Sequence, residues 1–375
     1  MKIINVVGAR PNFMKIAPLI EALNTRPDVE HLLVHTGQHY DRRMSQAFFD
    51  DLGMPRPDMD LGVGSGSHAE QTASVMVEFE KVLLCERPDW VVVVGDVNST
   101  MACTITAKKL GVKVAHVEAG LRSRDMSMPE EINRLVTDRL SDLLLTPDRL
   151  SSGNLLQEGV PVEKIRFVGN IMIDTLEAHR DRAALLDVAE VVRRNLLLPG
   201  TVVPDLSKGF ALLTMHRPSN VDQVEVLEPI LAFLTGEVAP VIPLIWPIHP
   251  RTGKMLESFG LWDKAAWCPG LVLTHPLGYH EMLRLNMQAV VALTDSGGLQ
   301  EECCVLGTPC LTLRWNTERP VTLKEHGGAG VLVGNSVERI RHEFHAALGT
   351  ERAPQRPEFW DGRAAMRCVT AIFEV

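Results

Sequence analysis

The sequence lacks the short motifs that mark the common dinucleotide, ATP and zinc sites. Gly8 follows the first apolar run, but the other glycines of a G-x-G-x-x-G turn are missing, and no G-x-x-x-x-G-K-[ST] occurs. A tightly held NAD and ATP chemistry are therefore disfavoured. No H-E-x-x-H occurs either, and His342 and His345 have the wrong spacing for two ligands on one helix face. We expect neither a metal site nor a cofactor.

Paired cysteines, long apolar runs and dense basic segments are also missing. The seven cysteines are odd in number, lie in apolar stretches and show no C-x-x-C spacing, which is typical of reduced core residues. No uninterrupted apolar run approaches a membrane span, and the apolar start is too short for the core of a signal peptide. The formal charge of −9 disfavours nucleic acid and anionic membranes as partners. We expect a soluble, cytoplasmic protein.

Two series of short apolar segments, each followed by an amphipathic stretch, run through the chain. Because 375 residues exceed the usual size of one hydrophobic core, we expect two domains, with a boundary near Gly169-Asn170. The first series predicts strands at 3–7, 31–35, 90–94 and 112–117 and helices near 13–24, 68–84, 98–109 and 130–141. The second predicts strands near 210–215, 242–246, 271–274, 289–294, 310–313 and 330–333 and helices near 222–236, 279–286, 298–306 and 336–347. This alternation predicts an α/β fold of two Rossmann-like, doubly wound domains that face a central cleft.

Residues 289–302 form an informative segment of the second half. An apolar strand runs into the turn D-S-G-G at 295–298, which opens an amphipathic helix. The two glycines let backbone amides approach an anion at the positive end of that helix, so the turn predicts a phosphate site. Glu301 and Glu302, one turn further along, are better placed for the hydroxyl pair of a sugar. The pattern favours a nucleotide with a ribose.

Charged residues also follow the buried strands of the first half. Asp96 comes directly after the apolar run 91–94, and Glu118 follows the next run, flanked by His116 and Arg122. A carboxylate is costly at a buried strand tip unless it is hydrogen-bonded or functional. Taken alone, Asp96 is typical of a helix cap. The setting of Glu118 is harder to explain as structure.

The helix that begins at Pro129 carries two acids in its first turn. Glu130 and Glu131, taken alone, are typical partners of the helix dipole. Further charged strings follow other predicted strands: T-G-Q-H (36–39), H-P-R-T (249–252) and N-T-E-R-P (316–320). A purely structural sheet needs no charge at nearly all of its carboxyl ends. The set therefore predicts an active cleft there.

Nine strings occur in a fixed order along the chain. They are G-A-R-P-N-F-M-K (8–15), T-G-Q-H (36–39), G-D (95–96), H-V-E-A-G-L-R (116–122), P-E-E-I-N-R (129–134), H-R-P-S-N (216–220), H-P-R-T (249–252), D-S-G-G-L-Q-E-E (295–302) and T-E-R-P (317–320). Together they closely resemble the non-hydrolysing UDP-N-acetylglucosamine 2-epimerases. The resemblance implies a glycosyltransferase-B-like pair of domains, one of residues 1–169 completed by a C-terminal helix at 356–375, the other of residues 170–355. It also implies a homodimer that serves polysaccharide biosynthesis.

The resemblance further implies an elimination and re-addition at carbon 2 of the sugar, without a redox cofactor. A base takes the carbon 2 proton as the anomeric carbon–oxygen bond to UDP breaks, which leaves a 2-acetamidoglucal. UDP then adds back while a proton is delivered to the opposite face. By motif position the acid-base and catalytic set is Asp96, Glu118, Glu130 and His216. Which of them takes the proton is left open.

The resemblance also assigns contacts to the UDP-sugar. Arg10 and the turn amides hold the diphosphate, with His216 as a further candidate, and Glu302 accepts from the ribose hydroxyls. The implied binding set is Arg10, Lys15, Gln38, His39, Arg134, Asn170, His249, Arg251, Ser296, Gly297, Gly298, Glu302 and Arg319.

Other functions remain open at this point. A hydrolysing 2-epimerase would form the same glucal but release N-acetylmannosamine and UDP. A glycosyltransferase of the same architecture would need an acceptor, and neither it nor a silent UDP-sugar sensor needs the clustered acids at 96, 118 and 130. A modified UDP-HexNAc, such as a 2,3-diacetamido or uronate sugar, is harder to exclude. Activation by substrate at a second site is in doubt, because the arginine that some relatives carry in the helix at 65–79 has no match here.

Overall fold

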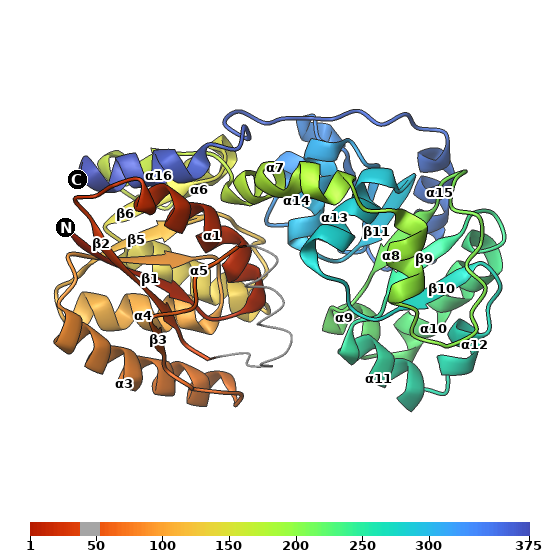
Figure 1. Cartoon of the computed structure of the whole chain (residues 1–375), viewed down its shortest axis with the longest axis horizontal. Coiled ribbons are helices and arrows are strands. Elements are labelled where there is room, and N and C mark those ends of the chain that lie inside the picture. Colours follow the sequence, from red (N-terminus) through yellow and green to blue (C-terminus); the bar gives the residue numbers. More distant parts are fainter. Residues whose placement is uncertain (38–52) are drawn as a thin grey trace. The chain divides into compact units, whose positions relative to one another are not determined.

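Two compact units make up the chain. The computed structural model describes residues 1–37 and 53–375. The first unit comprises Met1–Ala178 and Pro357–Val375, and the second comprises His179–Arg356 (Figure 1). Across the described residues, no helix has both the length and the apolar character that a membrane crossing requires.

The first unit is built on a seven-stranded sheet in which every pairing is parallel. Its strands are β1 (Lys2–Val7), β2 (Glu30–His35), β3 (Met59–Asp60), β4 (Trp90–Val94), β5 (Lys113–Val117), β6 (Leu143–Thr146) and β7 (Ile165–Phe167). The order across the sheet is β3-β2-β1-β4-β5-β6-β7. The central strand β4 is buried along its whole length, as its run of β-branched valines predicts for a strand covered on both faces.

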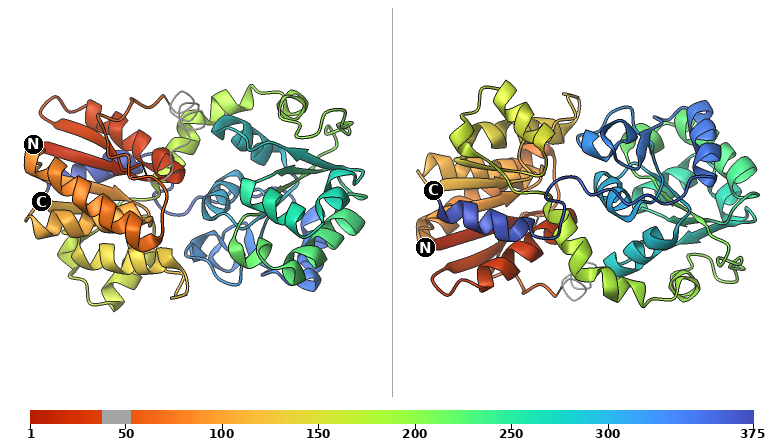
Figure 2. Two further views of the ribbon diagram at one scale, coloured as in Figure 1. Left: turned by 90° about the horizontal axis from the view of Figure 1, so that it is seen from below. Right: turned by 90° about the horizontal axis from the view of Figure 1, so that it is seen from above.

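Helices cover both faces of this sheet. They are α1 (Arg10–Asn24), α3 (His68–Glu86), α4 (Asn98–Lys109), α5 (Pro129–Leu140), α6 (Arg149–Gln157), α7 (Ile171–Ala184) and α16 (Ala364–Phe373), with a 3-10 turn η1 at Val162–Lys164. In Figure 1, α1 and α16 lie on one face and α3 and α4 on the other. Figure 2 shows that both chain termini lie on this unit.

The C-terminal helix is fastened to the first unit by specific polar contacts. The carboxylate of Asp174 in α7 accepts from the backbone N–H groups of Ala364 and Ala365 at 3.0 and 2.7 Å, which caps α16. The indole of Trp360, just before α16, donates to the carbonyl of Pro147 at 3.0 Å.

The second unit repeats this plan with six parallel strands. They are β8 (Ala211–Thr214), β9 (Leu244–Pro247), β10 (Leu271–Thr274), β11 (Val291–Thr294), β12 (Cys310–Thr312) and β13 (Gly330–Leu332), in the order β10-β9-β8-β11-β12-β13. The helices are α8 (Val188–Arg194), α9 (Pro218–Val221), α10 (Val224–Phe233), α11 (Pro250–Ser258), α12 (Trp262–Ala266), α13 (Tyr279–Gln288), α14 (Gly297–Leu306) and α15 (Val337–Leu348), with a π-helical turn η2 (Leu234–Val238) and 3-10 turns η3 (Pro320–Thr322) and η4 (Lys324–His326).

The predicted fold class is confirmed, since both units are doubly wound α/β sheets. Each strand predicted from the sequence is present within three residues of its predicted start. The strands β3, β6 and β7 were not predicted. By its contacts the chain divides after Ala178 and Arg356, whereas the sequence places these divisions at Gly169-Asn170 and near residue 356.

Candidate active site

The strand order of the first sheet reverses between β1 and β4, and the loops after these strands lie where ligands of doubly wound sheets bind. Asn12, in the first turn of α1, ties the two loops together. Its Oδ1 accepts from the backbone of Gly8 at 3.3 Å, and its Nδ2 donates to the carbonyl of Val94 at 3.0 Å. Gly95 then turns the chain with a φ of 67°, a conformation that favours glycine. This turn delivers Asp96.

Glu118 follows β5 in a left-handed conformation with a φ of 70°. Such a φ is uncommon for a residue with a Cβ and is found disproportionately at functional sites. Its side chain is 2% exposed and forms a short ion pair with Nζ of Lys15 from α1. A buried carboxylate without a cation would strongly destabilise the fold. The ammonium group of Lys15 supplies that cation and holds the Glu118 carboxylate in place.

Asp96 is held by a buried cation from α5. Arg134, whose side chain is 3% exposed, donates from Nη2 to the Asp96 carboxylate. Asn133 donates from Nδ2 to the backbone carbonyl of Asp96 at 2.8 Å. The Asp96 side chain is itself 24% exposed, so its carboxylate is reachable while its position is fixed from α5.

The adjacent acids Glu130 and Glu131 have different surroundings. Glu131 is buried and accepts from the backbone of Ser123 and Arg124, both at 2.9 Å, and from Nη1 of Arg134 at 2.7 Å. Glu130 is half-buried, and its side chain forms no hydrogen bond or ion pair within the described part of the chain. Glu131 is therefore committed to holding the loop, whereas Glu130 is available to a ligand.

In the second sheet the order reverses between β8 and β11, and His216 and Asp295 follow these two strands. Nδ1 of His216 lies 2.9 Å from Oδ1 of Asp295, and Oδ2 of Asp295 accepts from the backbone N–H groups of His216 and Arg217, both at 2.8 Å. Burial raises the pKa of Asp295, but the hydrogen bonds and charge of His216 and the hydrogen bond from Arg217 together lower it by more. The pKa of Asp295 therefore lies below its usual value. An ionised Asp295 thus orients the half-exposed His216 ring.

The glycine turn opens α14 as predicted, and Ser296 is its N-cap residue. A Cβ on Gly297 would lie 2.5 Å from Nη1 of Arg319 and 2.9 Å from Glu318, so this glycine permits the close approach of a side-chain pair. Gly298 follows in the first turn. The amides of such a helix start are free of intrahelical partners and are suited to an anion.

Arg319 lies beneath this turn with its charge already balanced. Its Nε is 2.7 Å from Oε1 of Glu301, and its Nη1 forms a short ion pair with Glu318. Its side chain is 7% exposed. Arg319 therefore packs against the buried side of the turn and stabilises its position.

Glu302 is buried on α14, next to Asn286 and Tyr279 of α13. Burial raises the pKa of its carboxyl, the side chains of Asn286 and Tyr279 lower it, and the neighbouring Glu301 raises it, with a result of about 7. Its protonation therefore changes in the neutral range.

Three other predicted binding residues make structural contacts. His249 caps α11 by accepting from the backbone of Arg251 at 3.2 Å, and its ring lies 5.2 Å from that of His216. The Arg251 side chain forms a surface ion pair with Asp222. Asn170 caps α7 by accepting from the backbone of Met172 at 2.9 Å.

Three predicted residues have no described side chain. Gln38 and His39 lie outside the described residues, and Arg10 is described only by its backbone position at the start of α1. The structure otherwise brings Lys15, Asp96, Glu118 and Arg134 together in the first unit, and His216, His249, Ser296, Gly297 and Arg319 in the second.

Comparison with known proteins gives the family. A sequence model of the UDP-N-acetylglucosamine 2-epimerase family matches residues 21–373. The UDP-N-acetylglucosamine 2-epimerase of Methanocaldococcus jannaschii is 42% identical over 374 residues, which is 99% of each chain. The chain belongs to this family. The UDP-2,3-diacetamido-2,3-dideoxy-D-glucuronate 2-epimerase of Pseudomonas aeruginosa is 38% identical over 371 residues, 98% of each chain.

Solved structures of the family share the fold. The crystal structure of the Methanocaldococcus jannaschii UDP-GlcNAc 2-epimerase in complex with UDP-GlcNAc and UDP matches with a TM-score of 0.90 and 40% identity, covering 100% of both chains. The Neisseria meningitidis UDP-GlcNAc 2-epimerase bound to UDP-GlcNAc matches with a TM-score of 0.86 and 27% identity, again over 100% of both chains. The family and the glycosyltransferase-B-like fold predicted from the sequence are thereby confirmed.

Proposed function

We propose that this chain interconverts UDP-N-acetylglucosamine and UDP-N-acetylmannosamine by epimerisation at carbon 2. The observation that carries the proposal is the set of acids that follow β4 and β5 and begin α5 in the first unit, in a chain of this family. Asp96 and Glu118 are each paired with a buried cation, and the Glu130 side chain makes no hydrogen bond or ion pair within the described residues. A silent sugar-binding protein has no need of three such acids.

The proposed chemistry is an elimination followed by re-addition. A carboxylate takes the proton from carbon 2, the electrons of that bond form the double bond between carbons 1 and 2, and the anomeric carbon–oxygen bond breaks to release UDP. The 2-acetamidoglucal then takes a proton at carbon 2 on the opposite face while UDP adds back to carbon 1. The reaction needs an acid and a base on two sides of one ring.

The two units divide the proposed work. Asp96, Glu118 and Glu130 of the first unit carry the proton transfers, and Lys15 and Arg134 hold two of these acids. In the second unit the helix start at Ser296-Gly297-Gly298 is suited to binding the diphosphate, and His216 is a further contact of that diphosphate. Glu302 accepts from the ribose hydroxyls. The family resemblance supports further contacts from Arg10, Gln38 and His39.

A second candidate substrate is a modified UDP-HexNAc. It is favoured by the 38% identity to the Pseudomonas aeruginosa enzyme, which is named for a UDP-2,3-diacetamido-2,3-dideoxy-D-glucuronate. The identity to the Methanocaldococcus jannaschii enzyme, at 42%, is only slightly higher. Both substrates therefore belong in the test.

We further propose that the protein is a cytoplasmic homodimer whose product enters polysaccharide biosynthesis. The family resemblance supports this proposal. Light scattering of the purified chain tests the oligomeric state. A monomer at the concentration used in the activity assay would contradict the proposed homodimer.

Proton NMR in deuterated water tests the reaction. Wild-type protein with UDP-N-acetylglucosamine should produce UDP-N-acetylmannosamine and incorporate deuterium at carbon 2. Glu130→Gln should slow both product formation and deuterium incorporation by about a hundredfold or more, as expected when a general acid-base group is removed. Glu325→Gln, at an exposed acid in η4, is the matched control and should leave the rate unchanged.

Each alternative has its own outcome in this experiment. Release of free N-acetylmannosamine and UDP would replace the proposal with the hydrolysing reaction. Exchange at carbon 2 only with the 2,3-diacetamido uronate sugar would favour the second substrate. No exchange with either sugar would refute an epimerase.

A further inference from the structure

A buried histidine–aspartate pair lies beneath the turns that follow β4 and β5. His116, near the end of β5, is fully buried; its Nδ1 lies 2.6 Å from Oδ1 of Asp138, and its Nε2 lies 2.9 Å from the carbonyl oxygen of Gly95. Asp138, on α5, also accepts from the backbone N–H of Gly120 at 3.0 Å. The pair is thus hydrogen-bonded to both turns at once.

The hydrogen-bond partners fix the protonation of the pair. A carbonyl oxygen and an ionised carboxylate can only accept, so both ring nitrogens of His116 have to donate. Burial raises the pKa of Asp138, but His116 and Arg122 together lower it by more, so the pKa lies below its usual value and favours the ionised carboxylate. From these contacts we infer that each ring nitrogen of His116 carries a proton.

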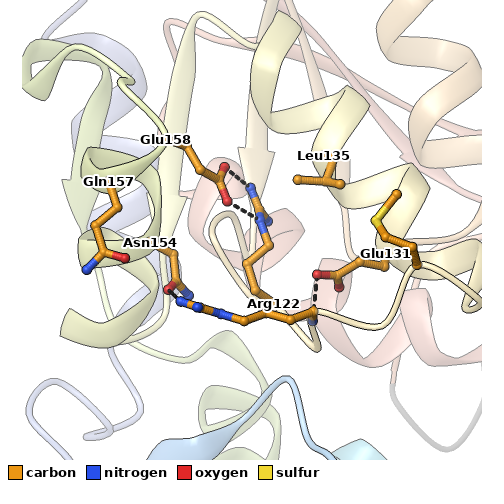
Figure 3. A pocket seen from close by; sticks show the side chains of 8 residues that line it. Arg122, Glu131, Leu135, Asn154, Gln157 and Glu158 are labelled. Carbon is orange, nitrogen blue, oxygen red and sulfur yellow. Dashed lines mark hydrogen bonds and ion pairs between the residues drawn. The ribbon is translucent and has the colours of Figure 1, made fainter.

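Arg122 completes the charge balance around Asp138. Its Nη1 lies 2.7 Å from Oδ2 of Asp138, and its Nε and Nη2 form a two-pronged ion pair with Glu158 at 2.8 and 2.7 Å. Figure 3 shows this fork at the wall of an open pocket of about 380 Å³. Asp138 is held from three sides and cannot rotate without breaking bonds to His116, Gly120 and Arg122.

The turns that the pair supports carry two of the proposed acids. Gly95 precedes Asp96 with a φ of 67°, and Glu118 has a φ of 70°. Glycine adopts such a φ without strain, whereas a residue with a Cβ, such as Glu118, persists there only where the surrounding structure holds it. His116 and Asp138 supply that hold, and they bridge the ends of two neighbouring strands.

We propose that His116 and Asp138 are positioning residues that fix the separation of Asp96 and Glu118 for the two proton transfers at carbon 2. This inference rests on the proposed function. Both side chains are buried, so the pair acts through the turns and not by touching the sugar.

Asp138→Asn tests the proposal with little change in shape. The new amide oxygen can still accept from Gly120, but its NH₂ group faces Nδ1 of His116, which must then accept and lose its proton. We expect kcat to fall about ten- to a hundredfold, because a misplacement of reacting groups by about 1 Å can cost about a hundredfold in rate. KM for UDP-N-acetylglucosamine should change by less than about twofold, because His116 and Asp138 are bonded to each other, Gly95, Gly120 and Arg122, none of which is a proposed contact of UDP.

Asp174→Asn is the matched control. Asp174 is also a buried aspartate of the first unit, but it caps α16. This variant should retain the wild-type kcat. A fall in kcat of equal size in both variants would assign the effect to general destabilisation and overturn the proposal.

Nitrogen-15 NMR of the His116 ring tests the pair without any substrate. Near neutral pH the wild-type ring should show two protonated nitrogens, and the Asp138→Asn ring should show one. A neutral ring in the wild type would overturn the inference even if the variant fails to fold, and so would an Asp138→Asn variant with a wild-type kcat. Failure of the proposed function would instead be seen as no exchange at carbon 2 in the wild type, with the ring spectrum unaffected.

Discussion

Glu302→Gln is the substitution whose effect on nucleotide binding can be worked out from the structure in most detail. Glu302 is buried on α14, and burial raises its pKa to about 7, against the pull of Asn286 and Tyr279. The hydroxyls of a bound ribose would donate to the carboxylate and favour its ionised form. Binding of a UDP-sugar is then coupled to loss of a proton from Glu302.

The sign and size of this coupling follow from the pKa. Above about pH 7 the carboxylate is already ionised and binding carries no proton cost. Below it, affinity falls by up to tenfold per pH unit, so binding at about pH 5.5 should be about thirtyfold weaker than at about pH 8. The same burial acts on folding. The carboxyl ionises in the unfolded chain at its ordinary value of 4.5, so stability falls as pH rises from there to about 7, by about 3 kcal/mol in total.

Calorimetric titration with UDP-N-acetylglucosamine between about pH 5.5 and pH 8 measures the coupling. Each phosphorus of this ligand carries one ester bond and one anhydride bond, so neither phosphate has a proton that titrates in that range. Wild-type affinity should rise with pH, whereas Glu302→Gln should bind more weakly than the wild type at the upper end and show no such rise. Equal pH dependence in the two proteins would refute the coupling, and Glu325→Gln, at an exposed acid, controls for loss of charge.

Three further substitutions probe other buried charges. Lys15→Met leaves Glu118 buried without its cation and should lower the free energy of unfolding, measured in urea melts, by about 3 to 5 kcal/mol. Adding Glu118→Gln should restore stability but not activity. A Lys15→Met single variant as stable as the wild type would contradict this account. Asp295→Asn weakens the hold on His216 and should lower kcat/KM by about tenfold or more in steady-state assays, and a wild-type value would remove the His216–Asp295 pair from the mechanism. Asp174→Ala removes the cap of α16 and should cost about 1 to 2 kcal/mol in thermal melts. Because burial raises the pKa of Asp174 to about 6, that loss should be larger at acid pH than above neutrality, and the reverse order would refute the sign.

The sequence predicts the central strands well because burial on both faces makes them continuous apolar runs. β4 is an example, with five buried residues in a row. Two of the three strands that were not predicted are short: β3 has two residues, and β7 has three, all half-buried. Such strands are stabilised by pairing with a neighbour that is distant in sequence, which no local pattern records. The third, β6, has four buried residues and was missed although it is an apolar run like those that were predicted.

The site was predictable as a set of charges but not as a set of pairs. The local pattern does not distinguish Glu130 from Glu131, because both begin the same helix turn, and only the family resemblance selects Glu130. The contacts of Glu131 with Ser123 and Arg124 show that Glu131 holds the loop. Asp138 was not predicted as a site residue. Its partner His116 lies 22 residues away, and their hydrogen bond exists only once β5 and α5 are packed.

The same limit applies to the cations. Arg319 and Arg251 were both implied by the family resemblance as contacts of the UDP-sugar. In the structure Arg319 is balanced by Glu301 and Glu318, and Arg251 by Asp222. A sequence shows that a cation is present but not whether a neighbouring acid already uses its charge.

The two units share a topology but carry different residues after the strands at the switch point. In the first unit, β4 leads into Gly95-Asp96, and Asp96 is paired with the buried Arg134. In the second, β11 leads into Asp295, whose carboxylate orients His216, and then into the start of α14. The fold supplies a place for a ligand in both units, and the residues at that place decide the chemistry. Acids suit proton transfer at a carbon, whereas amides at a helix start suit a diphosphate that must be kept between two steps. If Asp96→Asn abolished nucleotide binding rather than turnover, this division of work between the units would be wrong.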